Sequence, residues 1–198
     1  MAGTAKAYVP AAMNQGPGDI WIIGTPPSDS AQRLTLAADG TPDATAHPSS
    51  IHLGATTGPI TFNLKNKAKD IMADQFDAPI DKFVEAVEGT LEAEMAQQSV
   101  DLLQQAFSTG VYSTGTGYKQ LTFGGIAQVP SVCVAAIAPK RMGAGLFLVS
   151  LLYKVATTDG FTVTYGRAKQ SAHKLTFHGM VDITRTAGRQ IGVQYETI

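Results

Sequence analysis

Cysteine and charged and aromatic side chains are all scarce in this chain of 198 residues. Its single cysteine, Cys133, excludes an intrachain disulfide, and its place in the apolar run 131–138 predicts a buried core side chain. Charged residues make up 16% of the chain, below the roughly 25% of an average soluble domain. This low share indicates that part of the surface is covered by something other than water, and neighbouring copies of the chain would serve.

Long apolar runs are missing as well. The longest, 131–138 and 146–153, are too short to cross a bilayer as helices. The first fifteen residues contain one lysine and no apolar centre of a signal peptide. We therefore expect no membrane partner.

Motifs that carry chemistry are nearly absent. The Gly-Thr-Gly at 115–117 lacks the third glycine, the preceding strand and the following helix of a dinucleotide site. No Walker sequence, nucleophile elbow or basic stretch with interleaved aromatics occurs. The histidines, none of which has the spacing of a metal pair, are His47, His52, His173 and His178. We expect no catalytic residue, no cofactor, no metal and no sequence-specific binding of nucleic acid.

The few charges are unevenly placed. Residues 70–101 hold nine acids and one base, whereas residues 102–198 hold three acids and nine bases. Such a distribution allows copies of the chain to pair, and it allows one surface to be uniformly acidic. The alternative is that the two segments neutralise each other inside one subunit.

The periodicity of apolar residues predicts a mainly β fold, a sandwich or barrel flanked by one helix, in a single domain. Outside it we expect an irregular arm at 1–18, a long loop or extension at 25–50 and a mobile loop at 110–125. The segment 25–50 is interpreted as a linker or as an arm that is ordered only against a neighbour. The stretches expected as strands are 19–24, 51–55, 60–64, 131–138, 146–156, 161–167 and 175–183.

The stretch 83–98 has the composition of a helix but the pattern of a strand. Six of the seven odd-numbered residues from Phe83 to Met95 are apolar or glycine, and the acids lie mostly at even positions. Gly89 would cost a helix interior about 1 kcal/mol. We predict a strand whose odd residues face the core. The side chains that this places away from the core are Glu88, Glu92 and Glu94.

The residues that follow, 99–107, predict a helix. Ser99 can cap its N-terminus, Asp101 lies in the first turn, and Gly110 follows its end. The apolar side chains at helical spacing are Val100, Leu103 and Phe107.

Three stretches occur in a set order. Residues 53–59 read Leu-Gly-Ala-Thr-Thr-Gly-Pro and lead into an alternating strand to Leu64. Residues 69–81 run from Lys-Asp-Ile through Asp-Gln to Ala-Pro-Ile-Asp and continue into the acidic strand and the helix. Residues 184–192 read Thr-Arg-Thr-Ala-Gly-Arg-Gln-Ile-Gly and end a C-terminal strand. This ordered combination, without a catalytic motif, resembles the major tail tube proteins of long-tailed bacteriophages over roughly 50–107 and 144–198, whereas residues 25–50 depart from that pattern.

The resemblance implies a tail-tube fold, six copies per ring, and rings stacked into a hollow tube. Its partners would be copies of itself and other tail proteins, such as the tape measure and terminator proteins. DNA would pass through without sequence-specific contacts. The protein would be made in the bacterial cytoplasm, which one reduced cysteine suits, and would reside in the virion.

The resemblance also implies that four strands of each copy line the bore. Strands about 4.8 Å apart and tilted by about 45° then leave a bore of roughly 40 Å, which admits a DNA duplex. DNA carries about one charge per 1.7 Å, so an acidic wall would repel it and let it slide. The candidates for lumen-facing acids are Glu88, Glu92 and Glu94.

Three other classes stay open. One is a different self-assembling β protein, such as a capsid decoration protein or the tube subunit of a contractile secretion apparatus. The second is a β-sandwich that binds a carbohydrate or another ligand, which would be a monomer with an aromatic-lined cleft, although aromatic residues make up only 8% of the chain. The third is an enzyme that uses two acids of 70–101 as a catalytic pair.

Overall fold

The computed structural model describes residues 18–54, 56, 58–72, 80–95, 100–106, 110–124, 131–140, 145–157 and 173–198. Within them the chain forms ten strands and one helix, and the predicted mainly β fold is confirmed. The elements are β1 (Asp19–Ile23), β2 (Ile51–His52), β3 (Thr61–Ile71), β4 (Asp81–Met95), α1 (Val100–Ala106), β5 (Gly110–Gly115), β6 (Tyr118–Phe123), β7 (Val132–Pro139), β8 (Phe147–Ala156), β9 (His173–Gly179) and β10 (Gly192–Glu196).

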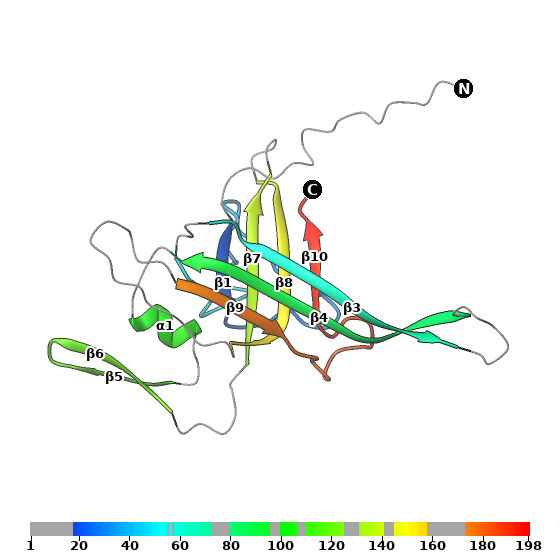
Figure 1. Cartoon of the computed structure of the whole chain (residues 1–198). Helices are drawn as coiled ribbons and strands as arrows, with labels where there is room; N and C mark the ends of the chain where they lie inside the picture. The colour runs from blue at the N-terminus through cyan, green and yellow to red at the C-terminus, as the bar shows by residue number, and fades with distance from the viewer. Residues whose placement is uncertain are drawn as a thin grey trace.

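Eight of the strands belong to one antiparallel sheet that bends into two layers. Their order is β2-β1-β7-β8-β9-β4-β3, and β10 pairs with β8 as well. Residues 148–152 of β8 pair with β10, whereas only Val155 and Ala156 pair with β9. The first layer therefore comprises β2, β1, β7, β8 and β10, and the second layer, β9, β4 and β3, crosses it as an open sandwich (Figure 1).

The main core lies between the two layers. Leu91 of β4 lies opposite Phe177 of β9, and both side chains are fully buried. The odd positions of β4 from Gly89 to Met95 are buried, as the alternation predicted. Leu103 of α1 packs against the same core, so the helix flanks the sandwich. The buried residues of this core are Ile20, Ile22, Leu53, Leu91, Ala93, Met95, Val134, Leu152, Val155, Leu175 and Phe177.

The predicted alternation is wrong for the first half of β4. Residues 67 and 68 of β3 lie opposite Ala86 and Val84, so Glu85 is an extra residue in β4. Such a bulge shifts the alternation by one position. Val84 consequently shares the core-side face of the hairpin, and Phe83 lies on the other face, where it is exposed.

A second apolar cluster lies on the outer face of the first layer. Residues 24–50 cover this face, and Leu34 is buried against β7 and β8. His47 is buried there too: its Nε2 accepts from the Thr35 N–H at 3.0 Å, so its Nδ1 donates to the Thr25 carbonyl at 2.8 Å. The segment 25–50 is thus neither a linker nor an arm ordered only by a neighbour, because its own subunit holds it. The buried residues of the cluster are Ile23, Leu34, Cys133, Ala135, Ile137, Val149, Leu151 and Tyr153.

Two hairpins extend from opposite sides of the body in Figure 1. The strands β3 and β4 project beyond the first layer, and β5 and β6 form a separate two-stranded sheet beside α1. The prediction of a mobile loop at 110–125 is therefore wrong for residues 110–123. These residues form a hairpin despite their many glycines, and its turn contains Gly117 at a φ of 84°, a conformation that glycine adopts without strain.

The C-terminal region also differs from the prediction. The strand expected over 175–183 begins at His173 and ends at Gly179, and residues 180–191 form a loop that leads into β10. The predicted strand at 161–167 and almost all of the predicted arm at 1–18 lie outside the described residues. The buried position predicted for Cys133 is confirmed, and burial raises the pKa of its thiol to about 12.

The two layers are in close contact at Gly89. A Cβ atom at this position would lie 2.9 Å from Leu152 Cδ2 and 3.1 Å from Ile191 Cγ2. We expect Gly89→Val to lower the free energy of unfolding by about 2–3 kcal/mol, because the extra methyl groups overpack the crossing. Urea unfolding measures this, and Ala86→Val at an exposed site of the same strand should change it by less than about 0.5 kcal/mol.

Candidate assembly surfaces

Sites for chemistry are not apparent in the described part of the chain. No group of three or more His, Cys, Asp and Glu side chains there is arranged to hold a metal ion. No helix there is long and apolar enough to cross a membrane. His52 contacts Asp19 through Nε2 and Oδ1 at 3.2 Å and packs on the Trp21 ring, an exposed pair at the end of the first layer.

The three predicted glutamates lie on the face of β4 that points away from the main core. Glu92 forms an ion pair with Lys174 of β9 at 2.6 Å, and Glu88 forms one with Lys67 of β3. The hydrogen bond to Glu88 raises the pKa of Lys67. Glu94 lies directly opposite Lys174 in the strand register. Each glutamate thus has a lysine of a neighbouring strand beside it.

This outer face of the second layer, formed by β3, β4 and β9, is therefore charge-compensated rather than uniformly acidic. Lys65 lies directly opposite Glu88, which adds a second lysine beside that carboxylate. Lys174 belongs to the basic C-terminal half of the chain, and so does Lys119, which pairs with Asp101. The ion pairs of Lys174 and Lys119 are those expected from the alternative in which the acidic segment 70–101 and the basic segment 102–198 neutralise each other inside one subunit.

The β3–β4 hairpin exposes large apolar side chains. They occupy both faces of the ribbon: Val84 and Val87 lie on the core-side face, and Phe83 lies on the other. Exposed apolar side chains gathered on one element mark an interaction site. Each of these residues is between 37% and 58% exposed. We call the following residues the hairpin surface: Leu64, Ile71, Met72, Ile80, Phe83, Val84 and Val87.

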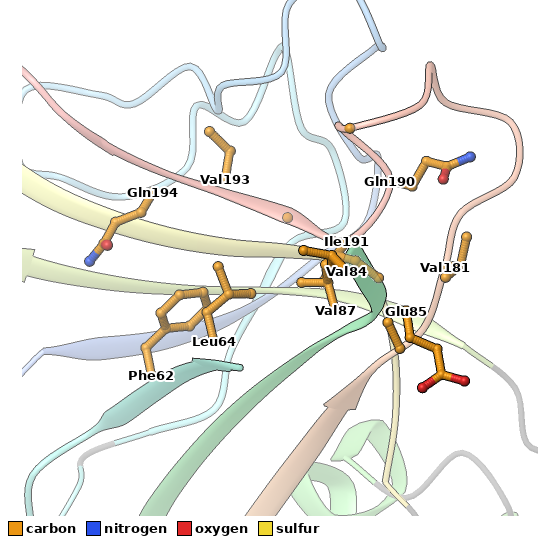
Figure 2. Close-up of a pocket in the computed structure, with 13 residues that line it drawn as sticks. Phe62, Leu64, Val84, Glu85, Val87, Val181, Gln190, Ile191, Val193 and Gln194 are labelled. Atoms are coloured by element: carbon orange, nitrogen blue, oxygen red, sulfur yellow. The ribbon is translucent and has the colours of Figure 1, made fainter. Parts of the chain in front are cut away.

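An apolar groove of about 610 Å³ lies where the hairpin leaves the cover of the first layer (Figure 2). Phe62, Leu64 and Val87 form one side of it. Ile191, which immediately precedes β10, and Gln194 of β10 form the other side. The groove is the open end of the main core, because Phe62 and Ile191 also pack against that core.

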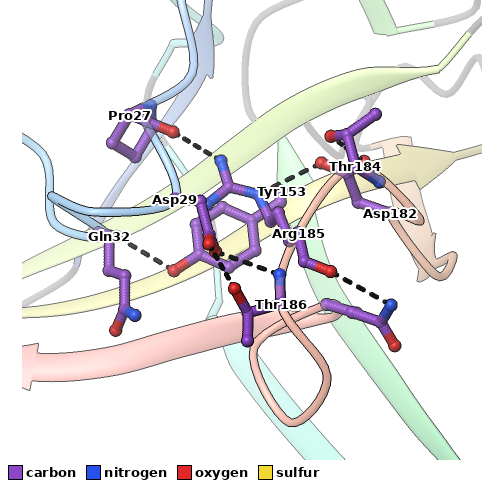
Figure 3. A network of polar contacts seen from close by, with 9 residues as sticks. Pro27, Asp29, Gln32, Tyr153, Asp182, Thr184, Arg185 and Thr186 are labelled. Carbon is purple, nitrogen blue, oxygen red and sulfur yellow. Dashed lines mark hydrogen bonds and ion pairs between the residues drawn. The ribbon is translucent and has the colours of Figure 1, made fainter.

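A buried arginine fixes the loop that leads to this groove (Figure 3). The Arg185 guanidinium lies 3.5 Å from the centre of the Tyr153 ring. Its Nε donates to Asp182 at 3.1 Å, and a terminal nitrogen donates to the Pro27 carbonyl. A hydrogen bond from the Thr184 hydroxyl at 2.7 Å is the main reason that the pKa of Asp182 is lowered. The carboxylate beside Arg185 is therefore held in its charged form.

Residues 24–50, which we call the covering segment, are joined to the loop 180–191 by a second set of contacts. The Thr186 hydroxyl donates to Asp29 Oδ2 at 2.6 Å, and this bond lowers the pKa of Asp29. The Tyr153 hydroxyl donates to the Gln32 carbonyl at 3.0 Å. The covering segment, the first layer and the loop 180–191 therefore form one connected unit that positions the start of β10.

Comparison of the sequence with protein-family models gives no match. Comparison with curated proteins gives none either.

Proposed function

We propose that this chain is a structural subunit that associates with copies of itself to build a hollow tube, in the manner of the phage tail tube proteins that its sequence resembles. The observation that carries the proposal is the hairpin surface together with the apolar groove at its base. Burying apolar surface stabilises an interface by roughly 25 cal/mol per Å². Seven large side chains held half-exposed on a projecting ribbon therefore favour association.

The arrangement of these surfaces supports a repeating assembly. The hairpin surface projects beyond the first layer (Figure 1), and the groove lies at the base of the hairpin (Figure 2), so one subunit presents two different surfaces. Contacts between unlike surfaces leave each copy with a free surface for the next, so they generate rings or filaments. Ring closure would also remove open sheet edges, which otherwise invite uncontrolled aggregation.

The outer face of the second layer is the wall that we propose for the bore. Its glutamates offset the lysines beside them, so DNA would meet compensated charge. Lysines alone would hold the phosphates. In this proposal Glu88, Glu92 and Glu94 keep the wall from binding DNA, rather than repelling DNA as a continuous acidic surface.

This role of the glutamates gives a measurable expectation. Replacing Glu88, Glu92 and Glu94 with glutamine leaves the lysines uncompensated, so assembled protein should retain DNA at 50 mM salt and release it at 200 mM. Co-sedimentation of assemblies with a DNA duplex measures the effect. A matched variant with glutamine at Lys65, Lys67 and Lys174 should retain none. Equal retention by both variants would contradict the proposed wall.

Sedimentation velocity over a range of protein concentrations tests the proposed association. We expect fast-sedimenting species that grow with concentration. A discrete dimer or trimer at every concentration would favour a decoration protein instead. A monomer throughout would favour a ligand-binding module, a class for which the groove offers one aromatic side chain, that of Phe62.

A further inference from the structure

We propose that the open edge of β10 and the groove beside it receive the β3–β4 hairpin of a second copy of this chain. The inference rests on the self-association proposed above and assigns the elements that meet. It joins three features: an unpaired strand edge, an apolar groove next to it, and a projecting ribbon with an open edge of its own.

The edge of β10 is available for pairing. The Thr197 N–H donates to the Phe147 carbonyl and the Tyr153 N–H donates to the Ile191 carbonyl, so the hydrogen-bonded pairs with β8 fall at odd positions. Alternation in an antiparallel pair then turns the backbone groups of the even positions away from β8. These residues are Gly192, Gln194 and Glu196. In the described part of the chain, β10 pairs with no strand other than β8.

The groove shows what a strand added at this edge would cover. At Gly89 the hairpin still lies on Leu152 and Ile191 of the main body. Beyond that point the first layer ends at β10, and the core-side face of the hairpin exposes Val84 and Val87. A strand beside β10 would extend the first layer beneath these side chains and bury them.

The β3–β4 hairpin of another copy fits this place. In the described residues β3 pairs only with β4, so its other edge is open. Beyond Gly89 the ribbon has seven residue pairs and is about 23 Å long and about 10 Å wide, so its two faces offer on the order of 500 Å². That is more than half of the roughly 800 Å² that each partner buries in a stable interface.

This pairing has a direction. A copy that inserts its hairpin into the groove of a neighbour keeps its own groove open for the next copy. The contact is therefore heterologous and continues until a ring closes. Pairing of β10 with β10 of another copy would instead end at a dimer.

A proline at position 194 tests the use of this edge. Gln194→Pro removes an N–H that points away from β8, so the hydrogen bonds within the subunit remain. Gln194→Thr keeps that N–H and serves as the matched control. We expect Gln194→Pro to keep the circular dichroism spectrum of the wild type and to raise the concentration at half-assembly at least tenfold, whereas Gln194→Thr should assemble as the wild type does. Assembly of Gln194→Pro at wild-type concentrations would overturn the inference.

Crosslinking identifies the element that arrives at the edge. Ala68→Cys and Gln194→Cys chains are mixed and treated with a bis-maleimide of about 10 Å, while the native Cys133 is buried. We expect crosslinks in the mixture that exceed those of either variant alone. Crosslinks of Gln194→Cys with itself would instead show edge-to-edge dimers and overturn the inference.

The outcomes separate this inference from the proposed tube. If the wild type forms tubes but the mixed variants do not crosslink, only the docking of the hairpin fails. If the mixture crosslinks but the assemblies are not tubular, the docking stands and the tube fails. If the wild type never associates, both fail.

Discussion

Replacing Val84 and Val87 with aspartate is expected to abolish assembly while leaving the monomer folded. Both side chains are exposed on the core-side face of the hairpin, so two charges there cost the monomer little. In an interface the same carboxylates would be buried without partners, which costs several kcal/mol each. The expected result is a monomer at concentrations at least a hundredfold above those at which the wild type assembles, measured by sedimentation velocity.

A matched change on the other hairpin shows whether the effect is local. Val111 is 62% exposed on β5, and Val111→Asp places the same charge on a surface that we have not assigned to the groove. It should shift the concentration at half-assembly by less than tenfold. If Val111→Asp abolishes assembly and the double variant of the β3–β4 hairpin does not, the assignment of the interface is wrong.

Replacing Arg185 with alanine is expected to produce the largest loss of stability among single changes outside the core. Its side chain is 5% exposed, and it binds Asp182 and the Pro27 carbonyl while it stacks on the Tyr153 ring. Asp182 is partly exposed, so its loss of the arginine costs less than in a buried pair; together with the lost hydrogen bond to the Pro27 carbonyl and the lost stacking contact, the change costs about 3 kcal/mol. The free energy of unfolding in urea should fall by this amount.

Two controls show that the contact itself is responsible. Arg189→Ala removes an exposed arginine of the same loop, and its cost should stay below about 1 kcal/mol. Arg185→Lys keeps the charge but loses the planar guanidinium, which stacks on the Tyr153 ring and donates to two partners at once. It should therefore restore little of the stability. A cost below about 0.5 kcal/mol for Arg185→Ala would contradict the role given to this network.

The strand β4 shows how far alternation in a sequence determines local structure. Apolar residues at odd positions from Gly89 to Met95 predict both the strand and its buried face, because that part packs against β9 and the first layer. The bulge at Glu85 was not predicted. Its only signal in the sequence is the apolar neighbours Phe83 and Val84, which cannot both point to one face of a regular strand.

The covering segment could not be predicted from local pattern. Its order comes from contacts with distant parts of the chain, such as the Tyr195 hydroxyl, which accepts from the Leu34 N–H at 3.0 Å. The buried His47 looks like any loop histidine in the sequence, because its partners are two backbone groups that only the fold brings together. Polar composition alone therefore suggested a linker.

The charged face was predicted in part. Alternation correctly turned Glu88, Glu92 and Glu94 away from the core, but it did not identify their partners. The lysines of β3 recur at odd positions from Lys65 to Lys69, and this signal was visible in the sequence. Lys174 was not identifiable as a partner, because its contact with Glu92 depends on the pairing of β9 with β4.

Electron microscopy of the wild-type chain, imaged across a concentration series, tests the central claim most directly. Six copies that pool the three described strands of their second layers around a common axis should form stacked rings with a continuous bore of roughly 30 Å, narrower than the roughly 40 Å that four strands per copy would give. Particles that remain single subunits at every concentration, or filaments without a bore, would contradict the account.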